Sequence, residues 1–212
     1  MLDLLMAGGP GMWPIAVCSV LVLAIVVERF WTLRRKSVAP PNLGGEVRAW
    51  AASRRLDAAH IDALEKNSPL GQVLASALRV RHQGREAIRE RVEDVGRHIM
   101  HDLNRFLTTL GTLALISPLL GLLGTVFGLI RMFLSVMSHG VGDAQYMAGG
   151  IGEALICTAA GLCVAVPAYI FHRYLRGRVV GYAIDMEREV FHLLDALDDT
   201  QQSTLPRKVA PR

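Results

Sequence analysis

Three long segments of this chain carry almost no charge. Residues 4–27 and 106–130 contain no Asp, Glu, Lys or Arg, and residues 144–171 contain only Glu153. In a helix that rises about 1.5 Å per residue, each run is long enough to cross a hydrocarbon core of about 30 Å. The sequence therefore predicts a polytopic membrane protein with three transmembrane helices.

The charged residues gather outside these segments. With 51% hydrophobic and 20% charged residues among 212, the chain suits either one apolar globular domain or a membrane protein with polar parts, and the separation of charge favours the second. Apolar residues recur at helical spacing between the charges, so we predict an all-α fold in which two spans extend into the cytoplasm as long helices. The predicted order is an N-terminal periplasmic segment 1–10, spans 11–31, 106–130 and 150–171, a cytoplasmic helical domain 32–105, a periplasmic loop 131–149, and a cytoplasmic helix and tail 172–212.

The positions of Lys and Arg predict the orientation. All but one of the 23 lie in residues 29–105 or 173–212, and the exception is Arg131. The positive-inside rule places those two regions in the cytoplasm and the N-terminus outside. The net charge of +4 then needs no nucleic-acid partner, and the lipid bilayer is the expected environment.

The second span combines small residues with a proline. Gly124 and Gly128 are four residues apart, so they let helix backbones touch where hydrocarbon gives helices no hydrophobic reason to associate. Pro118 leaves a backbone carbonyl without its usual partner. We expect tight packing in an oligomeric bundle through a set of packing or kink residues in the second and third spans: Pro118, Gly121, Gly124, Gly128, Gly161 and Pro167.

Glu153 is the only charge in the third span. A carboxylate at that depth costs a few kcal/mol, so it should face protein or water. One interpretation is a group that carries protons or attracts cations, and the other is a residue that caps the helix or bonds to a neighbouring helix. The glycines just before it keep the second interpretation open, since glycines are common next to the point where a helix begins.

Thr125 and Thr158 supply hydroxyl groups to the second and third spans. A membrane threonine commonly bonds a carbonyl one turn back in its own helix, and this role stands beside one in which the hydroxyl lines a proton pathway. Thr158 lies about 140° from Glu153 on an ideal helix, so the two side chains cannot both point straight into one lumen. Thr125 shares a direction with Pro118, seven residues earlier.

No set of residues indicates an enzyme, a metal site or a cofactor. The three cysteines fall in apolar runs, and no nucleophile triad, phosphate-binding loop or dinucleotide fingerprint is present. His98 and His101 have metal-ligand spacing with Asp94, but a solvated helix face explains them better. We therefore expect neither catalytic residues nor metal ligands.

Two stretches of the sequence resemble the core of the MotA/TolQ/ExbB proton channel family. They are Pro118-Leu-Leu-Gly-Leu-Leu-Gly-Thr-Val-Phe-Gly-Leu-Ile130 and Gly150-Ile-Gly-Glu-Ala-Leu-Ile-Cys-Thr-Ala-Ala-Gly-Leu-Cys-Val-Ala-Val-Pro-Ala168. The match looks closest to ExbB and TolQ, because the three-span layout departs from the four spans of MotA. The first 100 residues are supported by layout alone.

The resemblance implies an inner-membrane protein of a Gram-negative cell. It would form a homopentamer around the single spans of an ExbD- or TolR-like partner, whose membrane aspartate is the main proton carrier. It would couple the proton-motive force to a TonB-like protein that drives outer-membrane transport. The family's hydroxyls match Thr125 and Thr158, its glutamate matches Glu153, and its span prolines match Pro118 and Pro167. A TolQ-like role in envelope maintenance and a passive membrane scaffold are the alternatives.

Overall fold

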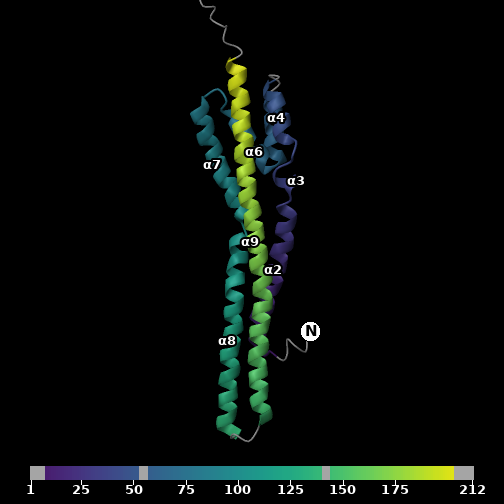
Figure 1. Ribbon diagram of the computed structural model, residues 1–212, viewed down its shortest axis with the longest axis vertical. Coiled ribbons are helices and arrows are strands. Elements are labelled where there is room, and N and C mark those ends of the chain that lie inside the picture. The colour runs from purple at the N-terminus through teal and green to yellow at the C-terminus, as the bar shows by residue number, and fades with distance from the viewer. Residues whose placement is uncertain (1–7, 53–56, 140–143, 203–212) are drawn as a thin grey trace, which may run out of the picture. The chain divides into compact units, whose positions relative to one another are not determined.

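The computed structural model describes residues 8–52, 57–139 and 144–202, and within these ranges it is helical with no strand (Figure 1). The all-α prediction is thereby confirmed. The helices, in chain order, are α2 (Met12–Thr32), α3 (Arg35–Val38), α4 (Leu43–Ala52), α5 (Ala58–Asn67), α6 (Pro69–Arg79), α7 (Arg85–Asn104), α8 (Leu107–His139) and α9 (Ala144–Gln202).

The chain divides into two compact units. The first, here the span unit, comprises residues up to 30 together with 105–176. The second, here the polar unit, comprises residues 31–104 together with those from 177 onward. Most of α2, all of α8 and the first half of α9 therefore belong to the span unit, and α3 to α7 belong to the polar unit.

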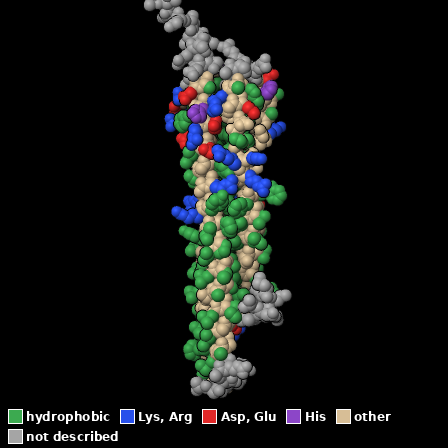
Figure 2. Space-filling model, turned by 45° about the vertical axis from the view of Figure 1, so that its right-hand side comes forward, with side chains coloured by type: hydrophobic (Ala, Val, Ile, Leu, Met, Phe, Trp, Pro, Cys, Tyr) green, Lys and Arg blue, Asp and Glu red, His purple; other side chains and the backbone are tan. Residues whose placement is uncertain are grey.

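The span unit exposes apolar side chains on its helices. Three helices in the described part of the chain are long and apolar enough to cross a membrane, which confirms the prediction of three spans. Trp13, Leu115 and Met137 are each at least 70% exposed. In the lower half of Figure 2, green hydrophobic side chains alternate with tan backbone, and few charged side chains are visible. Such a surface requires hydrocarbon or another apolar surface around it.

The polar unit is built around α6, which packs against α5 and α7. Ser68 caps this helix, because its Oγ accepts a hydrogen bond from the Gly71 backbone N–H at 3.1 Å. Pro69 occupies the first helical turn, where its missing N–H costs nothing. Every residue from Leu70 to Leu78 except Gln72 is buried, so α6 forms the core of this unit.

The sequence predicts that the second span extends as one long helix, but the structure shows a break in that extension. Helix α7 ends at Asn104 and α8 begins at Leu107. Between them Phe106 has φ 61°, a left-handed backbone that a bulky residue adopts only when its surroundings impose it. The guanidinium groups of Arg29 and Arg105 lie 5.1 and 4.9 Å from the centre of the Phe106 ring. Helix α9, in contrast, runs without a break through Pro167.

The backbone just after α2 is held by two side chains of α9. The Leu33 carbonyl accepts hydrogen bonds from Arg178 Nη2 at 2.6 Å and from Tyr182 Oη at 2.7 Å. Arg178 Nη2 also lies 2.6 Å from Tyr182 Oη. Carbonyls at the end of a helix lack partners within the helix, so these donors satisfy a group that would otherwise be buried unpaired.

We predict that Tyr182→Phe lowers the stability of the polar unit by about 1 kcal/mol, the usual net value of one buried hydrogen bond. The change removes only the hydroxyl that bonds to Leu33. Thermal denaturation of the purified protein in detergent measures the loss of stability. Tyr169→Phe is the control, because Tyr169 is exposed. Equal melting temperatures for the two variants would contradict the prediction.

Candidate functional site

Helices α8 and α9 lie side by side along a line of small residues, here called the glycine seam (Figure 1). At Gly124 an added Cβ would lie 2.5 Å from Cys157 Cβ, and at Gly161 it would lie 2.6 Å from the Ser117 carbonyl oxygen. Real Cβ atoms essentially never come that close to other atoms. The seam consists of Ser117, Gly121, Gly124 and Gly128 on α8 and Gly150, Ala154, Cys157, Thr158 and Gly161 on α9.

This contact lies within one chain. The close-packing glycines predict tight packing in an oligomeric bundle, and in the structure they bring two helices of the same chain together. Pro118 and Pro167 each lie inside a helix that continues past them. Next to Pro118, the buried Ser117 hydroxyl donates to the Leu113 carbonyl at 2.7 Å, which keeps this polar group paired in an apolar helix.

Gly124→Ala and Gly161→Ala are predicted to destabilise the span unit by about 1–3 kcal/mol, because the new methyl group would force the helices apart. Gly149→Ala and Gly152→Ala are the matched controls, since a Cβ at either position meets nothing within 4 Å. The yield and melting temperature of detergent-purified protein distinguish the two pairs. If all four variants behaved alike, the seam would not be the contact that holds α8 to α9.

Glu153, which lies between the seam residues Gly150 and Ala154 of α9, forms an ion pair with Arg131, three residues after Gly128 on α8. Arg131 Nη1 lies 2.7 Å from Glu153 Oε1 and 3.1 Å from Oε2, so one guanidinium nitrogen donates toward both carboxylate oxygens. The Glu153 side chain is 18% exposed and the Arg131 side chain 46% exposed. Hydrogen bonds between charged groups are shorter and stronger than neutral ones, so this pair fixes the position of the carboxylate.

The turn before α2 closes over the same carboxylate. Gly9 has φ +62°, and a Cβ there would collide with Glu153 Oε1 and come within 3.3 Å of Arg131 Nη1. The Cys157 thiol donates to the Gly8 carbonyl at 3.0 Å and so ties this turn to α9. Only glycine combines a left-handed backbone with the clearance that the pair needs.

The two threonines are not brought to Glu153. Thr125 Oγ1 donates to the Leu122 carbonyl of its own helix at 2.6 Å, which is the local bond common for membrane threonines. Thr158 Oγ1 donates to the Gly121 carbonyl across the seam at 3.2 Å. Of the three predicted pathway residues, therefore, only Glu153 meets an ionised partner within the described chain.

A cavity of about 320 Å³ lies beside the ion pair in the span unit. Arg131 is its only charged lining residue, and its other walls are apolar or glycine. The lining residues are Pro10, Gly11, Pro14, Leu120, Leu123, Gly124, Phe127 and Arg131. The cavity thus borders the guanidinium rather than the carboxylate.

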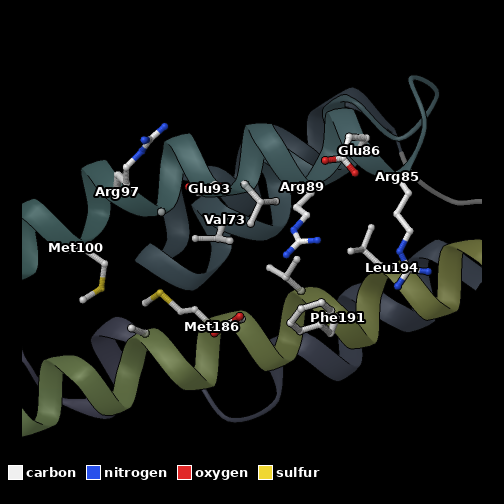
Figure 3. Close-up of a pocket in the computed structure, with 15 residues that line it drawn as sticks. Val73, Arg85, Glu86, Arg89, Glu93, Arg97, Met100, Met186, Phe191 and Leu194 are labelled. Atoms are coloured by element: carbon white, nitrogen blue, oxygen red, sulfur yellow. The ribbon is translucent and has the colours of Figure 1, made fainter.

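A larger cavity of about 670 Å³ lies in the polar unit between α7 and α9 (Figure 3). Arg89 points into it from α7 toward Phe191, whereas Arg97 points away. Acidic residues, among them Glu93 and Glu187, also line it. The cavity is lined by basic, acidic and apolar side chains together. This mixture does not indicate one class of ligand. Within the described residues no three His, Cys, Asp or Glu side chains are placed to hold a metal ion.

Arg131 and Gly9 are the site residues that the sequence analysis missed. A signal for Arg131 was present: it is the only Lys or Arg in the chain outside the two basic regions, and Glu153 is the only acid in the third span. Two isolated opposite charges on consecutive spans suggest an ion pair, because each alone is costly in a membrane. The role of Gly9 had no such signal, because it depends on where the turn before α2 lies.

Comparison with known proteins gives a consistent set of relatives. Residues 65–188 match the MotA/TolQ/ExbB proton channel family. A protein of Synechocystis named for its likeness to the biopolymer transport protein ExbB is 35% identical over 178 residues, which cover 82% of this chain and 70% of the relative. The biopolymer transport protein exbB1 of Vibrio cholerae is 33% identical over 160 residues, which cover 74% of this chain and 70% of the relative.

Proposed function

The chain belongs to the MotA/TolQ/ExbB proton channel family, and on this premise we propose that it is an ExbB-like subunit that couples the proton-motive force to TonB-dependent transport across the outer membrane. Its relatives named as ExbB support this role over that of TolQ or MotA. The proposed complex contains an ExbD-like single-span partner and a TonB-like protein.

The observation that carries this proposal is the Glu153–Arg131 ion pair. Two charged groups in apolar helices raise the cost of membrane insertion, and a stable helix pair needs neither, since the glycine seam already holds α8 against α9. A carboxylate can accept and release a proton, so Glu153 is suited to act in a proton pathway. Each charge that crosses the field yields about 2.3 kcal/mol per 100 mV, so several protons per cycle supply useful work.

The apolar surface of the span unit supports assembly with other chains. The seam glycines are occupied within the chain, so contacts between subunits would use larger side chains such as Leu119, Val126 and Phe133, which are at least 46% exposed. A homopentamer around the partner's spans is the assembly that the family resemblance implies. Lipid would cover the faces that no protein covers.

The distribution of Lys and Arg supports a location in the inner membrane of a Gram-negative cell. We place the polar unit in the cytoplasm, with the N-terminus and the loop between α8 and α9 on the periplasmic side. In this orientation the Glu153–Arg131 pair lies toward the periplasmic end of the spans, where protons enter when they flow down the proton-motive force. Arg131 is then the one basic residue on that side.

Glu153→Ala is expected to abolish growth on siderophore-bound iron in a deletion strain that the wild-type gene rescues. The chain should still reach the membrane in normal amounts, because the seam is intact. Growth rate at matched expression is the measurement, and a parallel detergent challenge tests for a TolQ-like role. Wild-type growth of the Glu153→Ala strain in both tests would overturn the proposal, and a detergent defect alone would transfer it to the Tol system.

Variants of Thr125 and Thr158 distinguish a role of these hydroxyls in proton transfer from a role in helix packing. Thr125→Val removes a hydroxyl that bonds only within α8, so a loss of siderophore-dependent growth at unchanged protein stability would support a role in proton transfer. Thr158→Val removes the bond to Gly121 across the seam and should lower the melting temperature as well. Unchanged growth with both variants would remove the hydroxyls from the proposed pathway while leaving Glu153 in it.

A further inference from the structure

Arg131 occupies an unusual position for a basic residue of this chain. Every other Lys and Arg lies in the two basic regions, which the proposed topology places in the cytoplasm. Basic residues on the opposite side of a membrane work against the expected orientation. The position of Arg131 on that side therefore requires a local interaction that stabilises it. Its contact with both oxygens of Glu153 is such an interaction.

Two parts of the chain contact the Glu153 carboxylate, whose side chain is 18% exposed. Arg131 Nη1 faces both oxygens, and the turn at Gly9 approaches Oε1 so closely that no Cβ would fit. The bond from the Cys157 thiol to Gly8 holds this turn in place from the buried side of α9. Because the Glu153 side chain is partly exposed, a proton can reach it from solvent, and it then competes with the Arg131 guanidinium for the carboxylate oxygens.

We infer that Arg131 is a positioning residue that gates Glu153: in the chain alone the ion pair is closed and blocks proton uptake, and binding of the partner opens it. This inference rests on the proposed function and adds a role for Arg131. A released guanidinium keeps its charge and needs another oxygen acceptor, which the bound partner would supply.

The proton balance of the step is simple. A hydronium ion on the periplasmic side gives its proton to one oxygen of Glu153, a new O–H bond forms, and a water molecule remains. The two N–H···O contacts from Arg131 are lost, while the guanidinium stays protonated throughout. No oxidant, reductant or other reactant takes part.

The test compares proton uptake by proteoliposomes that contain the full chain without a partner. A pH-sensitive dye inside the vesicles reports acidification when a membrane potential, negative inside, is imposed. Arg131→Gln should raise the rate of partner-independent uptake about fivefold, the change in population expected when one ion pair is lost. Arg131→Lys should give a smaller rise, because an ammonium group keeps the charge but not the planar donor geometry.

Arg79→Gln is the matched control. Arg79 makes an ion pair with Asp62 at 2.7 Å in the polar unit, so this change removes an arginine pair without touching the spans, and uptake should stay at the wild-type level. Arg131→Gln with Glu153→Gln should lose the added uptake, because no carboxylate remains to accept a proton. A double variant as active as Arg131→Gln would mean that the leak does not pass through Glu153, and the inference would fail.

Gly9→Ala gives a second test should Arg131→Gln fail to assemble. The added methyl group would push the turn away from the carboxylate and should also raise uptake. Gly84→Ala controls for backbone strain, because Gly84 has φ +95° with nothing within 4 Å of an added Cβ.

The two proposals fail separately. If Arg131→Gln and Gly9→Ala both matched the wild-type rate while Glu153→Ala still abolished siderophore-dependent growth, the gate would be refuted and the proposed function retained. If the strain that carries Glu153→Ala grew normally on siderophore-bound iron, the proposed function would be refuted, and the gate that rests on it would be refuted with it.

Discussion

Helices in hydrocarbon gain little by burying apolar side chains against each other, so α8 and α9 depend on direct backbone contact. That contact exists because small residues face each other along the whole seam, from Gly128 and Gly150 to Ser117 and Gly161. Dispersion and polar contacts such as the Thr158 bond to Gly121 act only at this short range. The seam also determines which side chains of α8 and α9 face away from the helix pair, because the small residues occupy the side where the two helices meet.

One consequence is the placement of the charges that α8 and α9 carry near the loop that joins them. Arg131 and Glu153 lie at the Gly128–Gly150 end of the seam, which brings their side chains to 2.7 Å from each other. The turn at Gly9 reaches the same carboxylate because a thiol of the seam, Cys157, bonds to Gly8. Packing and the candidate proton site are therefore parts of one arrangement, and a change in the seam would be felt at Glu153.

The polar unit is stabilised by a different balance of forces. Within it, α6 is held by apolar burial and by a capped first turn at Ser68 and Pro69. The Leu33 carbonyl obtains its donors from Arg178 and Tyr182. Backbone groups that a helix end leaves unpaired are here satisfied by side chains more than 140 residues away in the chain.

Much of this could be read from the sequence alone. Charge-free runs of sufficient length predict three spans, helical periodicity predicts the all-α fold, and the N-terminal signals of α6 are local, so all three depend only on neighbouring residues. The sequence also identified Glu153 as the unusual charge. The tertiary structure decided its partner, the location of the glycine contact within one chain, and the break at Phe106. The first two depend on which faces of distant helices meet. The break depends on the left-handed backbone of Phe106, whose ring lies beside the guanidinium groups of Arg29 and Arg105.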